Sequence, residues 1–223
     1  EEDVRSSPRQ DFGGKEVLPG DIKYKDVNGD GVVNNDDIVP IGYRTVPGVQ
    51  YGMGLSTSWK NFEFNILFQG SGKCDFFIGG NGPHAFRNGQ TGNILQTMVD
   101  DNRWIPSEIS GDVSTENPNA NWPRLTWGNN DNNNQKSTFW LRDGRYIRLK
   151  NIELRYNIPT TFTRKFFVSN MQIGFIGENL HTWSPFKLWD PENATTDEKN
   201  SGVRSGNAYP INRTYSCYIK LSF

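Results

Sequence analysis

Residues 143 to 159, DGRYIRLKNIELRYNIP, decide the fold class. Apolar and polar side chains alternate through the second half: the apolar set is Ile152, Leu154 and Tyr156, and the polar set is Glu153, Arg155 and Asn157. A period of two is the pattern of a β-strand with one apolar and one polar face. Because Ile147 and Leu149 are out of phase with the later residues, we expect a β-bulge near Lys150 and Asn151.

The same alternation occurs in four other segments, so the sequence predicts five strands and no comparable helix. The expected strands are residues 49–58 (VQYGMGLSTS), 62–70 (FEFNILFQG), 144–157, 168–179 and 212–223. Each has a face rich in Phe, Ile, Leu, Met or Tyr and a face rich in Gly, Ser, Gln or charge. The predicted fold class is therefore all-β.

The connections between these strands fall into two classes that alternate along the chain. The links at 59–61 and about 158–167 are short, whereas 1–48, 71–143 and 180–211 are long, polar and rich in Gly, Asn, Pro and Trp. Transmembrane β-barrels have such short turns at one end and long loops at the other. Five strands cannot close a barrel, because bacterial barrels begin at about 8 strands. We therefore expect one part of a large antiparallel transmembrane β-barrel.

Composition excludes two other classes of protein. The chain of 223 residues carries 24 Lys and Arg against 25 Asp and Glu, and this near-zero net charge argues against nucleic acid as the partner. It contains no apolar run approaching the roughly 18 to 20 residues of a membrane-spanning helix. Its two cysteines, Cys74 and Cys217, form no CxxC motif, and we expect them to be unrelated thiols.

A twelve-residue stretch, DVNGDGVVNNDD at residues 26–37, has the spacing of an EF-hand calcium loop. The expected ligands are the side chains of Asp26, Asn28, Asp30 and Asp37 at positions 1, 3, 5 and 12, and the carbonyl of Val32 at position 7. Gly31 stands at position 6, where the loop turns sharply. Calcium requires six to eight hard oxygens, which this spacing supplies. The alternative is a metal-free turn held by Asx hydrogen bonds.

No catalytic site is expected from the remaining polar residues. His84 and His181 are the only histidines, and each is predicted to lie in a loop without an acidic or Cys neighbour at ligand spacing. The pairs Asp100–Asp101 and Asp190–Glu192 could act as glycosidase carboxylates, but neighbouring acids in polar loops are usually caps and turn residues. We therefore do not expect an enzyme.

Aromatic residues of the long loops are the other candidates for contact with a ligand. They are Trp104, Trp122, Trp127, Phe139, Trp140, Trp183, Phe186 and Trp189. Tryptophan can stack on a sugar ring, pack one loop onto another or contact a partner protein. The sequence does not choose among these roles for any one of them.

Five motifs, in order and spanning nearly the whole chain, resemble the SusC/RagA family of TonB-dependent outer-membrane receptors. They are PGDIKYKDVNGDGVVNNDD (19–37), FEFNILFQGSGK (62–73), DGRYIRLKNIELRYNIP (143–159), GFIGENLHTWSPFKLWDPE (174–192) and YPINRTYSCYIKLSF (209–223). The resemblance implies the C-terminal strands of the family's barrel. Residues 1–48 would then form an extracellular loop region that holds the calcium loop, and 71–143 and 180–211 would be extracellular loops.

The same resemblance implies function, partners and location. Receptors of this family import oligosaccharides or peptides through the bacterial outer membrane, with energy delivered by TonB and with a SusD-like surface lipoprotein as a cap. The expected partners are the remainder of the barrel and its plug, that lipoprotein, TonB through the part of the receptor outside this chain, and outer-membrane lipid. The ion would be structural, because a lone loop is a poor sensor and calcium outside a cell is seldom limiting.

A second interpretation belongs to a different class of protein. The chain could be a secreted β-sandwich, stabilised by calcium, whose aromatic loops bind carbohydrate. The terminal residues YIKLSF favour the receptor, because a final aromatic resembles the assembly signal of outer-membrane barrels.

Overall fold

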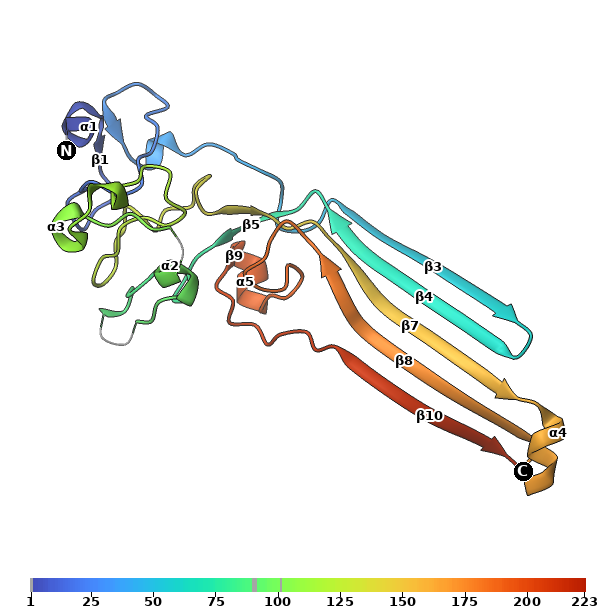
Figure 1. Ribbon diagram of the computed structural model, residues 1–223. Helices are drawn as coiled ribbons and strands as arrows, with labels where there is room; N and C mark the ends of the chain where they lie inside the picture. Colours follow the sequence, from blue (N-terminus) through green and yellow to red (C-terminus); the bar gives the residue numbers. More distant parts are fainter. Residues whose placement is uncertain (1, 90–91, 101) are drawn as a thin grey trace. The chain divides into compact units, whose positions relative to one another are not determined.

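The computed structural model describes residues 2–89, 92–100 and 102–223. These residues form two compact units, each built from three segments of the chain (Figure 1). Unit 1 comprises residues 1–42, 77–141 and 196–207, and unit 2 comprises 43–76, 142–195 and 208–223. No helix among the described residues combines the length and the apolar composition needed to cross a bilayer.

A single antiparallel sheet of five long strands forms most of unit 2 (Figure 1). Its strands are β3 (Val49–Trp59), β4 (Phe62–Gly72), β7 (Tyr146–Ile158), β8 (Asn170–Trp183) and β10 (Thr214–Ser222). Their order across the sheet is β10-β8-β7-β4-β3, so chain neighbours lie side by side. The expected all-β fold and the five strands are confirmed.

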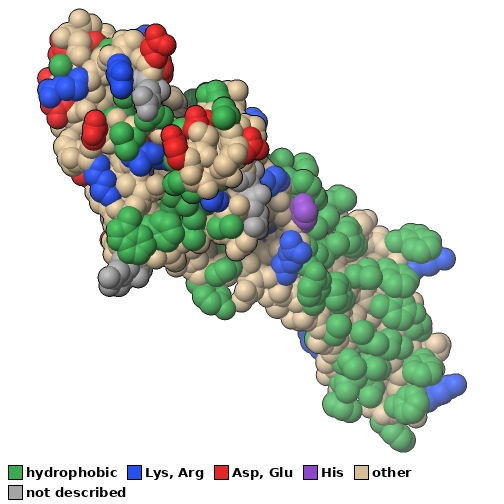
Figure 2. Space-filling model, turned by 60° about the vertical axis from the view of Figure 1, so that its left-hand side comes forward, with side chains coloured by type: hydrophobic (Ala, Val, Ile, Leu, Met, Phe, Trp, Pro, Cys, Tyr) green, Lys and Arg blue, Asp and Glu red, His purple; other side chains and the backbone are tan. Residues whose placement is uncertain are grey.

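One face of this sheet is apolar across all five strands. A row of directly opposed residues illustrates it: Thr57, Phe64, Leu154, Phe175 and Cys217. Most of this face is open to solvent in the chain, with Met53 68% and Ile219 62% exposed. Figure 2 shows hydrophobic side chains gathered over this part of the chain. Such a face requires a covering environment, because exposed apolar area costs about 25 cal/mol per Å².

The predicted β-bulge is confirmed in β7. Asn151 pairs with Leu67 and Leu149 pairs with Phe68, so Lys150 is the extra residue on the bulged strand. On the far side of the bulge Ile147 and Leu149 join the apolar face, and Arg148 joins the polar face opposite Gln69. The bulge therefore explains the change of phase in the sequence.

The opposite face of the sheet carries a network of charged and amide side chains. Arg155 donates from Nη1 to Glu63 at 2.9 Å and from Nη2 to Glu153 at 3.0 Å. Asn65 donates to Glu153 at 3.1 Å, and the hydroxyl of Tyr218 donates to the same residue at 3.3 Å. This network joins strands β4, β7 and β10 on the polar face.

Tyr218 reaches the network by lying across Gly174, its partner on β8. A Cβ on Gly174 would stand 2.2 Å from the ring of Tyr218, so any side chain there displaces the ring. We expect Gly174→Val to lower the free energy of unfolding by about 1 to 3 kcal/mol, as overpacking does in well-packed sites. Denaturant titration of the reconstituted protein measures this.

Gly72→Val is the matched control for that substitution. Gly72 also lies in a strand of the sheet, but a Cβ there would meet nothing within 4 Å. Equal losses from the two variants would show that the contact with Tyr218 does not decide the effect.

Arg148 and the acids Asp190 and Glu192 attach the connection that follows β8 to the polar face of the sheet. The side chain of Arg148 is 1% exposed, and its Nη2 lies 2.7 Å from both carboxylate oxygens of Asp190. Its Nη1 lies 3.4 Å from Glu192. Phe186 of the same connection is buried against Phe76 and Trp189. This connection is thus held by both a buried ion pair and aromatic packing.

Unit 1 contains short elements joined by long irregular segments. Its helices are α1 (Glu2–Ser6), η1 (Asn35–Asp37), α2 (Gln96–Asp100), α3 (Ser107–Ser110), η3 (Val113–Thr115) and α5 (Thr196–Ser201). Strands β1 (Arg9–Gln10) and β2 (Val32–Val33) pair in parallel. Two short strands, β5 (Asp75–Ile78) and β6 (Leu141–Asp143), contain the points in the sequence where one unit ends and the other begins. In unit 1, β5 pairs through Phe77 and Ile78 with β9 (Val203–Arg204).

The compact units divide the chain differently from the segments expected from sequence. Most of the loop region 71–143 gathers with residues 1–42 into one unit, instead of forming a separate loop on a strand domain. β8 also extends to Trp183, so His181 and Trp183 lie in a strand and not in a loop. Gly177 and His181 occupy the apolar face of β8 after Phe175, so the sequence shows no continuous series of apolar residues that would indicate this extension.

Candidate functional site

The loop at residues 26–37 folds as a compact turn stabilised by its own side chains. Gly29 and Gly31 take the left-handed region, with φ of 80° and 85°. A side chain is disfavoured at such angles, which explains the two glycines. The loop therefore needs both glycines to turn between its expected ligands.

Each expected side-chain ligand in the first half of the loop accepts a backbone hydrogen bond. Asp26 accepts from the N–H of Gly29 at 2.6 Å and from that of Gly31 at 2.9 Å. Asn28 accepts from the N–H of Asp30 at 2.9 Å, and Asp30 accepts from that of Val32 at 2.8 Å. The side chains at positions 1, 3 and 5 therefore all point toward the backbone N–H groups of the loop.

Asp37 closes the loop from its far end. One carboxylate oxygen accepts from the N–H of Val27 at 2.7 Å, and the other accepts from that of Asn34 at 2.9 Å in the capping box of helix η1. Hydrogen bonds from the backbone of Asn34 and then of Val27 lower the pKa of Asp37 below its usual value. Asp37 is therefore ionised at neutral pH, as a calcium ligand must be.

Strand β2 anchors the loop to the rest of unit 1. Val32 and Val33, at positions 7 and 8, pair with Arg9 and Gln10, and the N–H of Asp11 donates to the carbonyl of Val33 at 2.8 Å. The side chain of Val33 is 1% exposed. The loop is consequently held in one place by a buried residue and by two-stranded pairing.

The chemistry of this donor set suits calcium. All five expected ligands offer oxygen, and a carboxylate oxygen that accepts one N–H keeps a second lone pair for an ion. Within the described residues, no three His, Cys, Asp or Glu side chains converge as a metal cluster. Asp26, Asp30 and Asp37 are therefore not drawn together into a preformed cluster in this structure.

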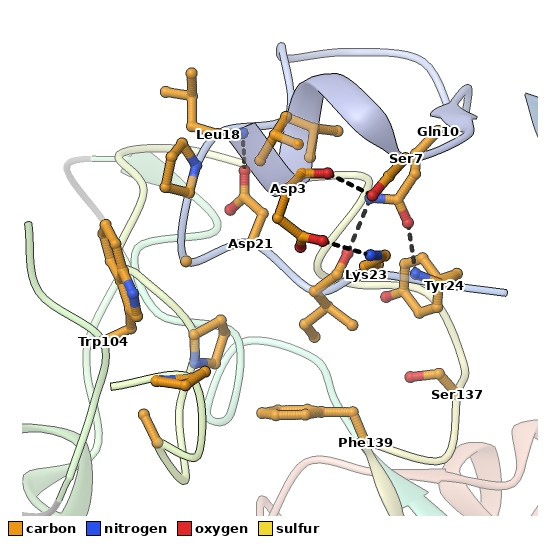
Figure 3. A pocket seen from close by; sticks show the side chains of 18 of the residues that line it. Asp3, Ser7, Gln10, Leu18, Asp21, Lys23, Tyr24, Trp104, Ser137 and Phe139 are labelled. Carbon is orange, nitrogen blue, oxygen red and sulfur yellow. Dashed lines mark hydrogen bonds and ion pairs between the residues drawn. The ribbon is translucent and has the colours of Figure 1, made fainter. Parts of the chain in front are cut away.

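A pocket of about 1060 Å³ lies in unit 1 and was not predicted from the sequence. Residues 3–24 form one wall, and Trp104 and residues of 117–139 form the other. Figure 3 shows Trp104 and Phe139 on the second wall, across from Asp3, Lys23 and Tyr24. Aromatic walls with a few polar groups are typical of ligand sites.

Asp21 joins the two walls of the pocket. Its side chain is 1% exposed and accepts hydrogen bonds from Arg124 at 2.8 Å and from Asn133 at 2.7 Å. It also accepts from the N–H of Leu18 at 2.9 Å, and Asn133 accepts from the N–H of Ile22 (Figure 3 shows the contact with Leu18). The tract NNDNNNQ at 129–135, with its many amide side chains, is the sequence signal that could have indicated this network.

Known receptors resemble this chain. No family model matches the chain. The chain is 30% identical over 208 residues to the TonB-dependent receptor P26 of Formosa agariphila, and 28% identical over 214 residues to the TonB-dependent receptor P3 of the same organism. The alignments cover 92% of this chain, but only 20% and 19% of those receptors. The chain is therefore similar to a segment of these TonB-dependent receptors. It spans about a fifth of the length of the curated relatives that it matches.

Solved structures give the same fold. The RagAB peptide importer in its "closed-closed" state matches 89% of the receptor segment with a TM-score of 0.61 and 21% identity, over 20% of the matched chain. The "open-open" state matches 81% with a TM-score of 0.56, over 18% of the matched chain. The five-stranded sheet of this segment is thus part of an antiparallel barrel of that type.

The loop aromatics of the receptor segment have different surroundings. Trp122, Trp140 and Phe186 are buried, and the rings of Trp122 and Trp140 lie 6.1 Å apart, so these three pack loops together. Trp127 is mostly exposed beside Phe86. Trp104 lines the pocket, where a Cβ on Gly20 would stand 2.2 Å from its ring. Of the eight candidates, Trp104 and Phe139 are therefore best placed to touch a ligand.

The other polar residues that were considered as catalytic candidates take part in contacts that stabilise the fold. Asp190 and Glu192 are engaged by Arg148, as described above. Asp101 lies outside the described residues. Cys74 is buried and Cys217 is exposed, and neither forms a disulfide.

His84 is buried beside Trp140, and both of its ring nitrogens lack a hydrogen-bond partner in the described part of the chain. Burial, with a smaller effect of the Arg87 charge, lowers the pKa of His84 to about 4. The unfolded chain therefore binds a proton near pH 6.5 that the folded chain binds only near pH 4. We expect stability to be complete above about pH 6.5 and to fall by about 3 kcal/mol as the pH drops to about 4.

The measurement is the pH dependence of proteolysis in residues 80–140 of the assembled receptor. His84→Gln removes the titrating group and should flatten this dependence between those two pH values. The matched control is His181→Gln, because His181 is not buried. That variant should keep the pH dependence of proteolysis. A wild-type profile that is flat across this range would contradict the assignment.

Proposed function

We propose that this chain supplies strands and outer loops to an outer-membrane receptor that imports nutrients with energy from TonB. The observation that carries the proposal is the sheet of unit 2, with one face exposed and apolar and the other charged and hydrogen-bonded. Lipid outside and a wet lumen inside call for that arrangement. The relatives named as TonB-dependent receptors support the same assignment.

The remainder of the barrel is the first partner that the sheet needs. β3 and β10 are its outermost strands, and each has one edge without a neighbour in the described chain. In lipid, every unpaired backbone group costs several kcal/mol, so both edges must pair with other strands. The polar face would then meet the lumen and the plug, and the apolar face would meet outer-membrane lipid.

A SusD-like surface lipoprotein is the second proposed partner, and the imported nutrient is an oligosaccharide or a peptide. The matched structures are described as a peptide importer, which is a property of that protein. The pocket of unit 1, with Trp104 and Phe139 on one wall and the Lys23–Asp3 ion pair on the other, is the proposed site of contact with nutrient or lipoprotein. We place the receptor in the bacterial outer membrane and assign it no catalysis.

The test is purification of the receptor from membranes of the organism that encodes it. We expect a polypeptide well above the mass of this chain, 25.4 kDa, that requires detergent and is recovered together with a surface lipoprotein. Material that stays folded and monodisperse without detergent would refute the membrane assignment. A receptor recovered without any lipoprotein would refute the proposed partner alone.

The secreted β-sandwich is less consistent with the sheet. A sandwich buries its apolar strand faces against a second sheet about 10 Å away. Here the apolar face of the only large sheet in the described residues is mostly exposed. The exposed face therefore favours the barrel.

The ion proposed for residues 26–37 is a structural calcium. Asp26, Asn28, Asp30 and Asp37 would supply side-chain oxygens and Val32 its carbonyl. Because β2 links the loop to β1, a bound ion would stiffen the region from which one wall of the pocket is built. The chemistry of the ligands and the spacing of the loop support this proposal.

Substitution of two ligands tests the ion. We expect Asp26→Ala combined with Asp30→Ala to abolish stoichiometric calcium and to make residues 20–47 sensitive to protease. Barrel insertion should continue, because no strand of the large sheet contains a loop residue. Metal analysis and mapping of cleavage sites measure the two effects.

Asp36→Ala is the control for this pair. Asp36 lies in the same loop, but it is not an expected ligand. The hydrogen bond from its backbone N–H to the side chain of Asn34 survives the change. A double variant that retains calcium would show that other residues are the ligands. Failure of the double variant to insert would make the ion part of assembly.

A further inference from the structure

The turn between β7 and β8 exposes an unusual concentration of aromatic side chains. It consists of α4 (Thr160–Thr163) and η4 (Arg164–Phe166), followed by Phe167 and Val168. Phe162 and Phe166 are 53% and 63% exposed, and Phe167 is 92% exposed. Two basic residues, Arg164 and Lys165, lie between these rings in the sequence. A turn exposed only to water would have no reason to carry three phenylalanines.

Phe167 also holds an unfavourable backbone conformation. Its φ is 59° and its ψ is 23°, which is the left-handed region, at the C-terminal end of η4. Glycine or asparagine is the usual residue there, because a bulky side chain is strained at these angles. A phenylalanine at this position costs stability and contributes no burial within the chain. Strain of this kind points to a role in contact with something else.

The turn is nevertheless well formed beneath its exposed rings. Thr163 is 1% exposed and Val168 is buried, and the N–H of Val168 donates to the carbonyl of Thr163 at 3.3 Å. The N–H of Phe167 donates to the carbonyl of Arg164 at 3.2 Å, and the rings of Phe162 and Phe166 lie 5.5 Å apart. The aromatic side chains are therefore presented outward by a fixed scaffold.

The neighbouring turn of the same sheet repeats this combination of aromatic and basic residues. Trp59, Phe62 and Tyr156 are directly opposed on the apolar face, in the row nearest the β3–β4 turn. Within that turn, the ammonium group of Lys60 lies 4.6 Å from the ring centroid of Trp59. Figure 1 shows the β3–β4 turn and α4 at the same end of the sheet. The apolar face of the strands thus continues into aromatic and basic residues at this end.

We propose that the turn of residues 160–168 is an interfacial anchor that inserts its phenylalanines into the phospholipid headgroup region. The proposal rests on the proposed barrel, and it adds a lipid contact by a turn to the lipid contact of the strands. Aromatic rings favour the boundary between hydrocarbon and water, and Arg164 and Lys165 complement lipid phosphates. Continuity with the apolar strand face favours lipid over a protein partner as the occupant.

Spin labels in the complete receptor, reconstituted in bilayers of phosphatidylethanolamine and phosphatidylglycerol, test the anchor. Native Cys217 is exposed on the apolar face opposite Phe175, and it supplies the reference for hydrocarbon. Phe167→Cys in a Cys217→Ser background reports on the turn. We expect its label to collide several-fold more with oxygen, relative to an aqueous nickel chelate, than a label at Glu108→Cys in unit 1. This ratio should remain below that of Cys217.

The outcomes separate the anchor from the barrel. If the label at Cys217 is in lipid and the label at 167 responds only to the nickel chelate, the turn lies in water and the anchor is refuted. If the label at 167 is shielded from both reagents, a protein covers the turn, which also refutes the anchor. If Cys217 itself is not in lipid, the proposed membrane placement fails first. Should Phe167→Cys not assemble, Phe162→Cys gives the same reading from the other side of the turn.

Discussion

Asp190→Ala should destabilise the receptor by about 3 to 5 kcal/mol, because it leaves the guanidinium of Arg148 buried without its principal partner. Both oxygens of Asp190 lie 2.7 Å from Nη2 of Arg148, whose side chain is 1% exposed. Glu192 cannot replace Asp190, since it is 3.4 Å from the other nitrogen and more exposed. Denaturant unfolding of the reconstituted receptor measures the loss, and proteolysis near residues 184–195 locates it.

The double variant Asp190→Ala with Arg148→Met is the matched control. Removing both charges leaves no buried ion without a partner, so most of the stability should return. Glu192→Gln should cost about 0 to 1 kcal/mol, as partly exposed pairs do. If Asp190→Ala and the double variant lose the same amount, packing of the connection and not the ion pair determines its stability.

Ile219→Arg should lower barrel stability by about 2 to 4 kcal/mol if its level in the bilayer is near the middle. Ile219 lies near the centre of β10 on the apolar face, directly opposite Ile173, and is 62% exposed in the chain. The arginine would place its charge in hydrocarbon. Folding titrations into lipid vesicles measure the change.

Ser216→Arg is the companion variant on the polar face of the same strand. It lies opposite Ile176 of β8, and its side chain should meet the lumen. We expect a change within about 1 kcal/mol, because water or the plug solvates a charge there. Equal damage from Ile219→Arg and Ser216→Arg would show that the two faces of β10 do not meet different environments.

The strands of unit 2 could be predicted from the sequence because their alternation is a local property. The apolar face of β7 can be recognised from three alternate residues of the strand itself, Ile152, Leu154 and Tyr156. The change of phase at Lys150 locates the bulge. The end of β8 could not be found in the same way. After Phe175, the apolar face of β8 carries Gly177 and His181, which do not mark an apolar face, and only the pairing with Leu149 and Ile147 shows that the strand continues.

The features of the candidate site also differ in whether they depend on local or on distant residues. The twelve-residue loop is a contiguous pattern, so its expected ligands could be named before the structure. The pocket depends on Asp21 meeting Arg124 and Asn133, residues more than a hundred positions away. No local rule predicts which of the many Asn and Asp residues in long loops will meet. Likewise, the burial of Trp122 and Trp140 depends on how residues 77–141 fold upon themselves.

The single extra residue of β7 sets a limit on how this strand can change in length. From Ile158 back to Ile152, even-numbered side chains face the apolar side, whereas before Lys150 the odd-numbered ones do. Loss of that residue would carry Arg148 to the apolar face, away from Asp190, and would bring Leu149 to the charged face. Length at this point is therefore under stronger constraint than residue identity. In a set of related receptors, the position should tolerate substitution freely and insertion or deletion hardly at all.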